Sequence, residues 1–218
     1  AAKQLEIAIL REQMNKAVHA LKASGLGIRY RGKAALYALP WYVVIGASAA
    51  GKSTLLRNSN LNFPYAHGDD VTVQGFGGTR NCDWWFSDEA ILLDTAGRYS
   101  TEDGDHDEWM IFLSLLKKYR PNMPVNGVIV TVSFSDLLTC EETGIDWHLK
   151  VIRHRIEELN KKLDYHLPVY LVFTKVDLIR GFEAFFSSSS EKERDQVWGI
   201  SELMAIETRA FETKIQKA

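Results

Sequence analysis

The sequence has few cysteines and no excess of charge of either sign. Its 218 residues include two cysteines, Cys82 and Cys140, which are too few and too far apart for a disulfide framework or a zinc site. Lysine and arginine total 26 and aspartate and glutamate total 28, so the formal net charge is −2. This balance argues against nucleic acid or an anionic membrane as a partner, because both attract strongly basic surfaces.

Long hydrophobic runs are also missing. The longest, LYALPWYVVIG and VNGVIVTVSF, fall short of the roughly 20 residues that a transmembrane helix needs, and from its first residues we expect no signal peptide. The first residue is an alanine, so we expect the sequence to be a piece of a longer protein. Its composition, 46% hydrophobic and 25% charged, is that of an ordinary globular domain.

Short apolar runs alternate with helical patterns. Runs suited to buried strands lie at 42–45, 84–86, 90–93, 127–134 and 169–173, and helical periodicity marks 3–23, 107–119 and 145–163, with Gly25 as a stop for the first helix. This alternation predicts an α/β fold with a doubly wound, mostly parallel sheet.

Two of these strands break the alternation. DWWFS and AILLD are separated only by Asp88 and Glu89, which is too short for a parallel crossover, so we expect an antiparallel hairpin. Trp84 and Trp85 point to opposite faces of that hairpin, and we expect one to face the core and the other solvent or a partner.

One stretch has a specific chemical pattern. GASAAGKS, Gly46 to Ser53, fits G-x-x-x-x-G-K-[ST], follows a buried strand and precedes a helical segment. Small residues let successive backbone N–H groups surround an anion, and the helix N-terminus favours negative charge at the same place. The predicted ligand is a nucleoside triphosphate, either ATP or GTP, with Mg²⁺. The predicted binding residues in this stretch are Gly46, Ala49, Ala50, Gly51, Lys52, Ser53 and Thr54.

Roles follow from the chemistry of these side chains. Lys52 would meet the β- and γ-phosphates, and the Ser53 hydroxyl would hold Mg²⁺. In ILLDTAGR, Asp94 ends a strand and would hold Mg²⁺ through water, while the N–H of Gly97 would sense the γ-phosphate. Thr79, in the glycine-rich QGFGGTRNC, is a candidate to close over the metal.

A third motif, VFTKVD, ends the last predicted strand. It resembles the N-K-x-D motif with which GTPases read guanine, with Thr174 in place of asparagine, the stem of Lys175 on the ring and Asp177 as acceptor. Guanine offers Asp177 two adjacent donors and adenine offers one, so this site should favour GTP. The alternative is a strand that ends in a solvated lysine and aspartate.

Taken together, the runs LPWYVVIGASAAGKSTLL, NCDWWFSDEAILLDTAGRY, NGVIVTVSFSDLL and PVYLVFTKVDLIRGFEAFF resemble the cytoplasmic NTPase domain of the IcmF/TssM family of type VI secretion proteins. The resemblance covers roughly 39–199. It implies a Ras-like P-loop fold, attachment to the bacterial inner membrane by helices outside this sequence, and a TssL/DotU-type membrane protein and baseplate components as partners. Ala49 departs from the family, whose members commonly have glycine there.

The expected organisation is an N-terminal helical extension (1–38), a Ras-like P-loop NTPase domain (39–185) and a C-terminal helical segment (186–218) that opens with a loop, SSSSEKER, before a helix over 194–216. Two functions remain open: a slow NTPase, or a nucleotide-sensing or structural domain that holds secretion partners. Arg98 separates them. It occupies the place of the water-orienting glutamine of Ras-like enzymes, and a guanidinium has no acceptor for a proton, although it could stabilise phosphoryl charge.

Overall fold

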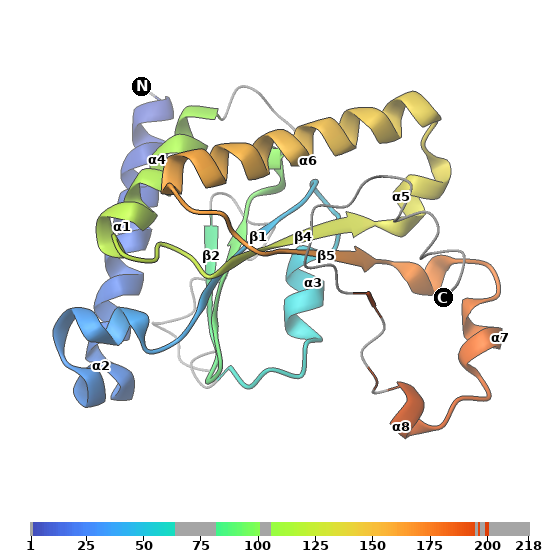
Figure 1. The fold of residues 1–218 in the computed structure, drawn as a ribbon, viewed down its shortest axis with the longest axis horizontal. Helices are drawn as coiled ribbons and strands as arrows, with labels where there is room; N and C mark the ends of the chain where they lie inside the picture. The colour runs from blue at the N-terminus through green and yellow to red at the C-terminus, as the bar shows by residue number, and fades with distance from the viewer. Residues whose placement is uncertain (1, 64–81, 101–105, 195, 197–198, 201–218) are drawn as a thin grey trace. The chain divides into compact units, whose positions relative to one another are not determined.

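The computed structural model describes residues 2–63, 82–100, 106–194, 196 and 199–200. The chain divides into two units, Ala1–Ile179 and Arg180–Ala218. The first unit contains the sheet (Figure 1).

The first unit is built on a five-stranded sheet in the order β2-β3-β1-β4-β5. The strands are β1 (Trp41–Ile45), β2 (Cys82–Phe86), β3 (Ile91–Thr95), β4 (Gly127–Ser133) and β5 (Val169–Thr174). Strand β1 runs parallel to β3 and β4, and β4 runs parallel to β5. Strand β2 pairs with β3 in antiparallel register. The predicted α/β class, the mostly parallel sheet and the hairpin are therefore confirmed.

Helices connect the strands. In the first unit they are α1 (Ala2–Ala23), α2 (Gly25–Tyr30), α3 (Lys52–Arg57), α4 (His106–Tyr119), α5 (Phe134–Thr139) and α6 (Glu142–Leu163), with the short 3₁₀ turns η1 (Gly32–Tyr37), η2 (Gly97–Ser100) and η4 (Val176–Leu178). None of the helices in the described part of the chain is both long and apolar enough to cross a membrane. Gly25 does not act as the predicted stop: α1 ends at Ala23, and Gly25 begins α2 after a break at Ser24.

Helices pack on both faces of the sheet (Figure 1). Val43 and Ile45 of β1 share a buried cluster with side chains of α1, α4 and α6, whereas Val44 shares a second cluster with Leu56 of α3. Since successive residues of a strand point to opposite faces, the two clusters lie on opposite sides of the sheet. The long helices therefore cover one face and α3 the other.

The two hairpin tryptophans are both buried, at 5% exposure each. Trp84 packs edge-on against Trp41 with ring centroids 5.2 Å apart, and Trp85 packs against Phe63 at 5.4 Å. The expectation that one would face solvent or a partner is wrong, because the segment after α3 brings Phe63 over the second face of the hairpin.

In the second unit, the residues that the structure describes form two short helices, α7 (Phe182–Phe186) and α8 (Glu191–Arg194). The sequence predicts a loop over SSSSEKER, but the second half of this segment forms α8. Ser190 and Glu193 form a reciprocal cap: the N–H of Glu193 donates to Ser190 Oγ at 3.3 Å, and the N–H of Ser190 donates to Glu193 Oε2 at 2.8 Å. Most of the helix predicted over 194–216 lies outside the described residues.

Candidate functional site

The predicted site residues lie at one edge of the sheet. Strands β1, β3, β4 and β5 are parallel, so their carboxyl ends meet at this edge, and β1 stands between β3 and β4. After β1 the chain leads to β3 on one side of β1, and after β4 it leads to β5 on the other side, so the direction of the connections reverses between β1 and β4. Open α/β sheets bind ligands at such a switch point. The segment Gly46–Ser53, called loop 46–53 below, follows β1 at this point.

Lys52 is fixed inside loop 46–53. Its Nζ donates to the carbonyl oxygens of Gly46 at 2.9 Å and Ala47 at 3.0 Å, and the residue is 7% exposed. Burial lowers the pKa of the Lys52 ammonium from its ordinary value, and the carboxylate of Asp94 partly opposes that shift. An ammonium has three N–H donors and these two contacts use two, so one donor remains for an anion.

The backbone of the loop is unusual at two positions. Gly51 has φ of 84° and forms the N-cap of α3, and Ala49 has φ of 60°. Positive φ is easy for glycine, but it costs an alanine roughly 1–2 kcal/mol, because Cβ approaches the following carbonyl oxygen. Ala49 therefore holds a left-handed conformation under strain.

Ser53 and Asp94, the predicted Mg²⁺ residues, meet across the site. Ser53 Oγ donates to Asp94 Oδ2 at 2.6 Å, and Asp94 is fully buried at 0% exposure. A hydroxyl and a carboxylate are hard oxygen ligands of the kind Mg²⁺ accepts, and this ion keeps several waters. Within the described residues no group of three or more His, Cys, Asp or Glu gathers as metal ligands, so phosphate and water would complete the shell. Thr79 lies outside the described residues.

The turn η2 packs directly on loop 46–53. A Cβ added to Gly97 would lie 2.4 Å from the backbone N and Cα of Ser48, so only glycine fits. At the other end of the turn, Ser100 Oγ accepts a hydrogen bond from the N–H of Gly46 at 3.1 Å. The sequence singles out Gly97 for sensing phosphate, and the structure places its backbone against the loop.

Arg98, on the same turn, contacts two helices. Its Nη2 donates to Glu6 Oε2 of α1 at 2.9 Å and to Glu108 Oε2 of α4 at 3.0 Å. The hydroxyl of Tyr99 also lies 3.4 Å from Glu108 Oε2, and burial, with the Glu108 carboxylate, raises the pKa of Tyr99. The sequence predicts Arg98 near phosphate, and the structure shows it engaged by two carboxylates that sequence reasoning did not find.

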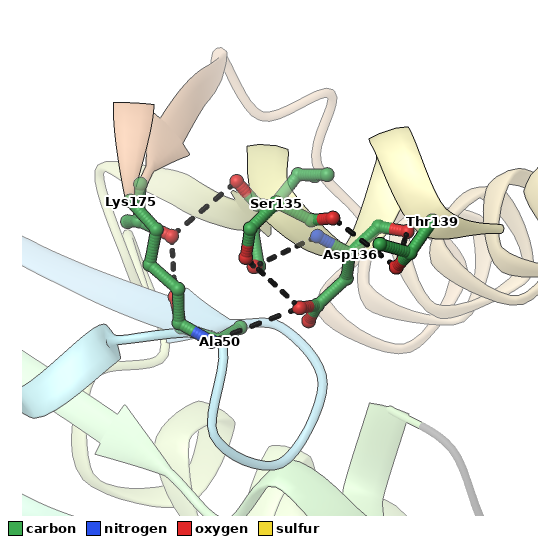
Figure 2. A network of polar contacts seen from close by, with 8 residues as sticks. Ala50, Ser135, Asp136, Thr139 and Lys175 are labelled. Atoms are coloured by element: carbon green, nitrogen blue, oxygen red, sulfur yellow. Dashed lines mark hydrogen bonds and ion pairs between the residues drawn. The ribbon is translucent and has the colours of Figure 1, made fainter. Parts of the chain in front are cut away.

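The proposed base-reading residues lie at the end of β5. Thr174 Oγ1 donates to the carbonyl of Ala50 at 2.6 Å, which ties this strand to loop 46–53. Lys175 has φ of 56°, and its Nζ lies 3.8 Å from Asp136 Oδ1 of α5, as Figure 2 shows together with the hydrogen bonds of Ser135 and Thr139. Asp177 is exposed on η4.

Sequence reasoning missed Asp136 and Ser100 as well. Asp136 follows the carboxyl end of β4, and Ser100 is three residues after Gly97, so both flank predicted strand ends or motifs. The rule that ligands bind at the carboxyl ends of parallel strands would have found Asp136. A pocket of about 50 Å³ lies beside Ala47 and Ala50 and reaches α5 and α6.

Comparisons with known proteins agree on one family. The IcmF-related N-terminal domain family matches residues 102–215. The chain is 46% identical over 201 residues, 90% of its length, to the type VI secretion system component TssM1 of Pseudomonas aeruginosa, of which it spans 18%.

The chain also matches a solved structure, that of an ADP-ribosylation-factor-like GTP-binding protein (small COPII coat GTPase SAR1) from Encephalitozoon cuniculi in complex with GDP. The match covers 75% of this chain and 81% of the other at 11% identity. Its TM-score of 0.27 is too low to support an argument. The sequence matches suffice, and the chain belongs to the IcmF/TssM family.

Proposed function

We propose that this domain binds a nucleoside triphosphate with Mg²⁺ at loop 46–53, in a Ras-like P-loop fold, and hydrolyses it slowly. The observation that supports this most is the meeting of Lys52, Ser53 and Asp94 at the carboxyl ends of β1 and β3. A cation, a hydroxyl and a buried carboxylate converge on a loop of small residues, which is the chemistry that a polyphosphate with a divalent cation requires.

Each residue has a distinct part in binding. Lys52 directs its remaining N–H toward the β- and γ-phosphates, and the backbone N–H groups at the start of α3 bind phosphate oxygens. Ser53 and Asp94 hold Mg²⁺, which neutralises charge on the phosphates when bound. Their mutual hydrogen bond keeps both oxygens in place beforehand. Gly97 brings its N–H beside the loop, and Thr79 remains a proposed third residue at the metal.

Slow turnover follows from the residue after Gly97. Arg98 offers only donors, so it does not orient an attacking water as an amide does. Its guanidinium is also bound by Glu6 and Glu108, and breaking a paired, partly buried contact would slow any movement toward phosphate. Fast hydrolysis therefore needs a further group, supplied by a partner or by a repositioned Arg98.

The cellular location and the partners that we propose come from membership of the family. The relative is named a type VI secretion system component, so we assign this domain to a secretion membrane complex at the cytoplasmic face of the inner membrane. A TssL/DotU-type protein and baseplate components are its proposed partners. The second candidate function, a nucleotide-sensing or structural domain without turnover, is favoured by the engagement of Arg98 with two carboxylates.

Nucleotide titration tests the proposal directly. Fluorescent ATP and GTP analogues are titrated with and without Mg²⁺ into the parent chain, Lys52→Ala and Lys150→Ala, the last changing an exposed lysine of α6. Loss of the Lys52 ammonium should lower affinity by at least about tenfold, because a charge-assisted bond to phosphate contributes about 1.5–3 kcal/mol. The Lys150 variant should bind like the parent.

Two results would contradict parts of the proposal, one about the binding site and one about turnover. Equal binding by the parent and Lys52→Ala, or no binding by either, would rule out loop 46–53 as the site. Single-turnover hydrolysis by the parent, measured against Arg98→Ala and Arg98→Gln, separates a slow NTPase from a domain that only senses nucleotide. Hydrolysis at rates typical of enzymes, unaffected by either substitution, would contradict slow turnover.

A further inference from the structure

The turn η2 connects loop 46–53 with the N-terminal helix. Gly97 packs on Ser48 at one end of the turn, and Ser100 accepts from Gly46 at the other. Arg98 lies between them and donates to Glu6 of α1. Two residues of a single short turn therefore touch the loop, while a third touches α1.

The contacts of Arg98 differ in burial. On the inner side, the Glu108 side chain is 5% exposed, and the guanidinium lies 5.2 Å from the ring centroid of Tyr99. On the outer side, Glu6 is 39% exposed and belongs to α1. Glu108 and Tyr99 thus hold Arg98 in its place on the turn, and Glu6 joins this position to α1.

We propose that the Arg98–Glu6 ion pair couples the nucleotide state of loop 46–53 to the packing of α1. Because no space remains between Gly97 and Ser48, a shift of the loop when phosphate binds displaces the turn and, with it, Arg98. The pair with Glu6 then lengthens or tightens, and α1 is held more loosely or more firmly. Glu6 is a positioning residue, and the inference rests on the proposed nucleotide binding.

Coupling between two sites is reciprocal. If nucleotide changes the strength of the Arg98–Glu6 contact by some factor, removal of the contact changes nucleotide affinity by the same factor. Binding at one coupled site commonly changes affinity at the other by about 5- to 150-fold. A partly exposed ion pair is a weak interaction, so we expect a change in nucleotide affinity of about three- to tenfold. A purely structural role for Glu6 would alter stability without this dependence on nucleotide.

The same helix supplies a matched control. Glu12 of α1 also forms an ion pair, with Lys16 at 2.7 Å, but the two side chains are 65% and 69% exposed and both belong to α1. Glu6→Gln and Glu12→Gln therefore remove the same charge from the same helix. Only the first removes a charge that pairs with η2.

Hydrogen exchange and affinity are measured on the parent chain, Glu6→Gln and Glu12→Gln. Exchange of α1 amides is compared with and without Mg²⁺ and a non-hydrolysable GTP or ATP analogue, and dissociation constants are obtained for the same analogues. In the parent and in Glu12→Gln, nucleotide should change α1 exchange by about three- to tenfold. In Glu6→Gln this change should disappear, and the dissociation constant should shift by the same factor.

Failure of the coupling and failure of the proposed function look different. A parent that binds the analogue but shows the same α1 exchange in both states overturns the coupling alone. So does a Glu6→Gln variant that matches Glu12→Gln in both measurements. A parent that binds neither analogue, with its fold verified by circular dichroism, overturns the proposed nucleotide binding and the coupling with it.

Discussion

The two ends of the candidate site differ in how firmly they are built. At the β3 end, Lys52 and Asp94 are buried and Gly97 is packed against the loop without space for a side chain. At the β5 end, Leu171 is 54% exposed, and Lys175 makes a long ion pair of 3.8 Å with a half-exposed Asp136. The first end lies in the middle of the sheet, and the second follows the last strand in its order.

This difference indicates what the site should recognise. For the proposed phosphate and metal, Lys52 and Asp94 are already buried and, like Ser53, hydrogen-bonded, so binding at this end should need little ordering of side chains. Groups on an exposed strand are solvated and weakly held, so they contribute less to discrimination between one base and another. We therefore expect strong dependence on the phosphates and weak dependence on the base.

The largest effect should come from filling the space at Gly97. In Gly97→Ala the new Cβ would meet the backbone of Ser48 at 2.4 Å, which the turn or the loop must relieve by moving. Overpacking of this kind costs about 1–3 kcal/mol, and the rigidity of two backbones favours the upper part of that range. Urea denaturation measures the free energy of unfolding, and nucleotide titration measures the accompanying loss of affinity.

Gly25→Ala provides the comparison for Gly97→Ala. A Cβ at Gly25 meets nothing within 4 Å, and the residue begins α2, so the substitution should leave stability unchanged or raise it slightly. If Gly97→Ala is as stable as Gly25→Ala, the packing of η2 against loop 46–53 is not as tight as the structure shows.

Much of the first end could be read from the sequence, and less of the second. The pattern from Gly46 to Ser53 and the strand before Asp94 are local features, so their roles follow from spacing. The partners of Arg98 could not be predicted in this way. Glu6 is 92 residues from it, and only the packing of α1 brings the two together.

The buried tryptophans show the same limit. Alternation along β2 correctly places Trp84 and Trp85 on opposite faces, but it does not reveal that Phe63 covers the second face. The capping box at Ser190 and Glu193 is different, because its spacing is visible in the sequence and indicates a helix start that our expectation of a loop over SSSSEKER overlooked. The start of α8 is therefore set by a local signal, whereas the burial of Trp85 depends on a tertiary contact with Phe63.

A smaller effect is expected at the β5 end. Asp177 would accept one more hydrogen bond from guanine than from adenine, and because its carboxylate is exposed we expect this bond to contribute no more than about 1.5 kcal/mol, a preference for GTP over ATP of about tenfold at most. Asp177→Asn should remove that preference and leave phosphate-dependent affinity in place. Competition between the two nucleotides measures it, with Asp146→Asn, at an exposed position of α6, as the control. A preference above a hundredfold would show that the base end is better ordered than its exposure suggests.

The smallest effect should arise within loop 46–53 itself, at Ala49. Its φ of 60° costs an alanine roughly 1–2 kcal/mol, and glycine removes that cost while adding about 0.5–1 kcal/mol of backbone entropy to the unfolded chain. Ala49→Gly should therefore raise the free energy of unfolding by about 0.5 kcal/mol. Ala47→Gly is the matched comparison, since Ala47 has no positive φ and should lose stability. Nucleotide affinity should change by less than about threefold in Ala49→Gly, because the loop already holds the conformation that glycine favours. A large gain in affinity would mean that bound nucleotide selects a loop shape that Ala49 resists, and the phosphate end would then be less preformed than its buried contacts indicate.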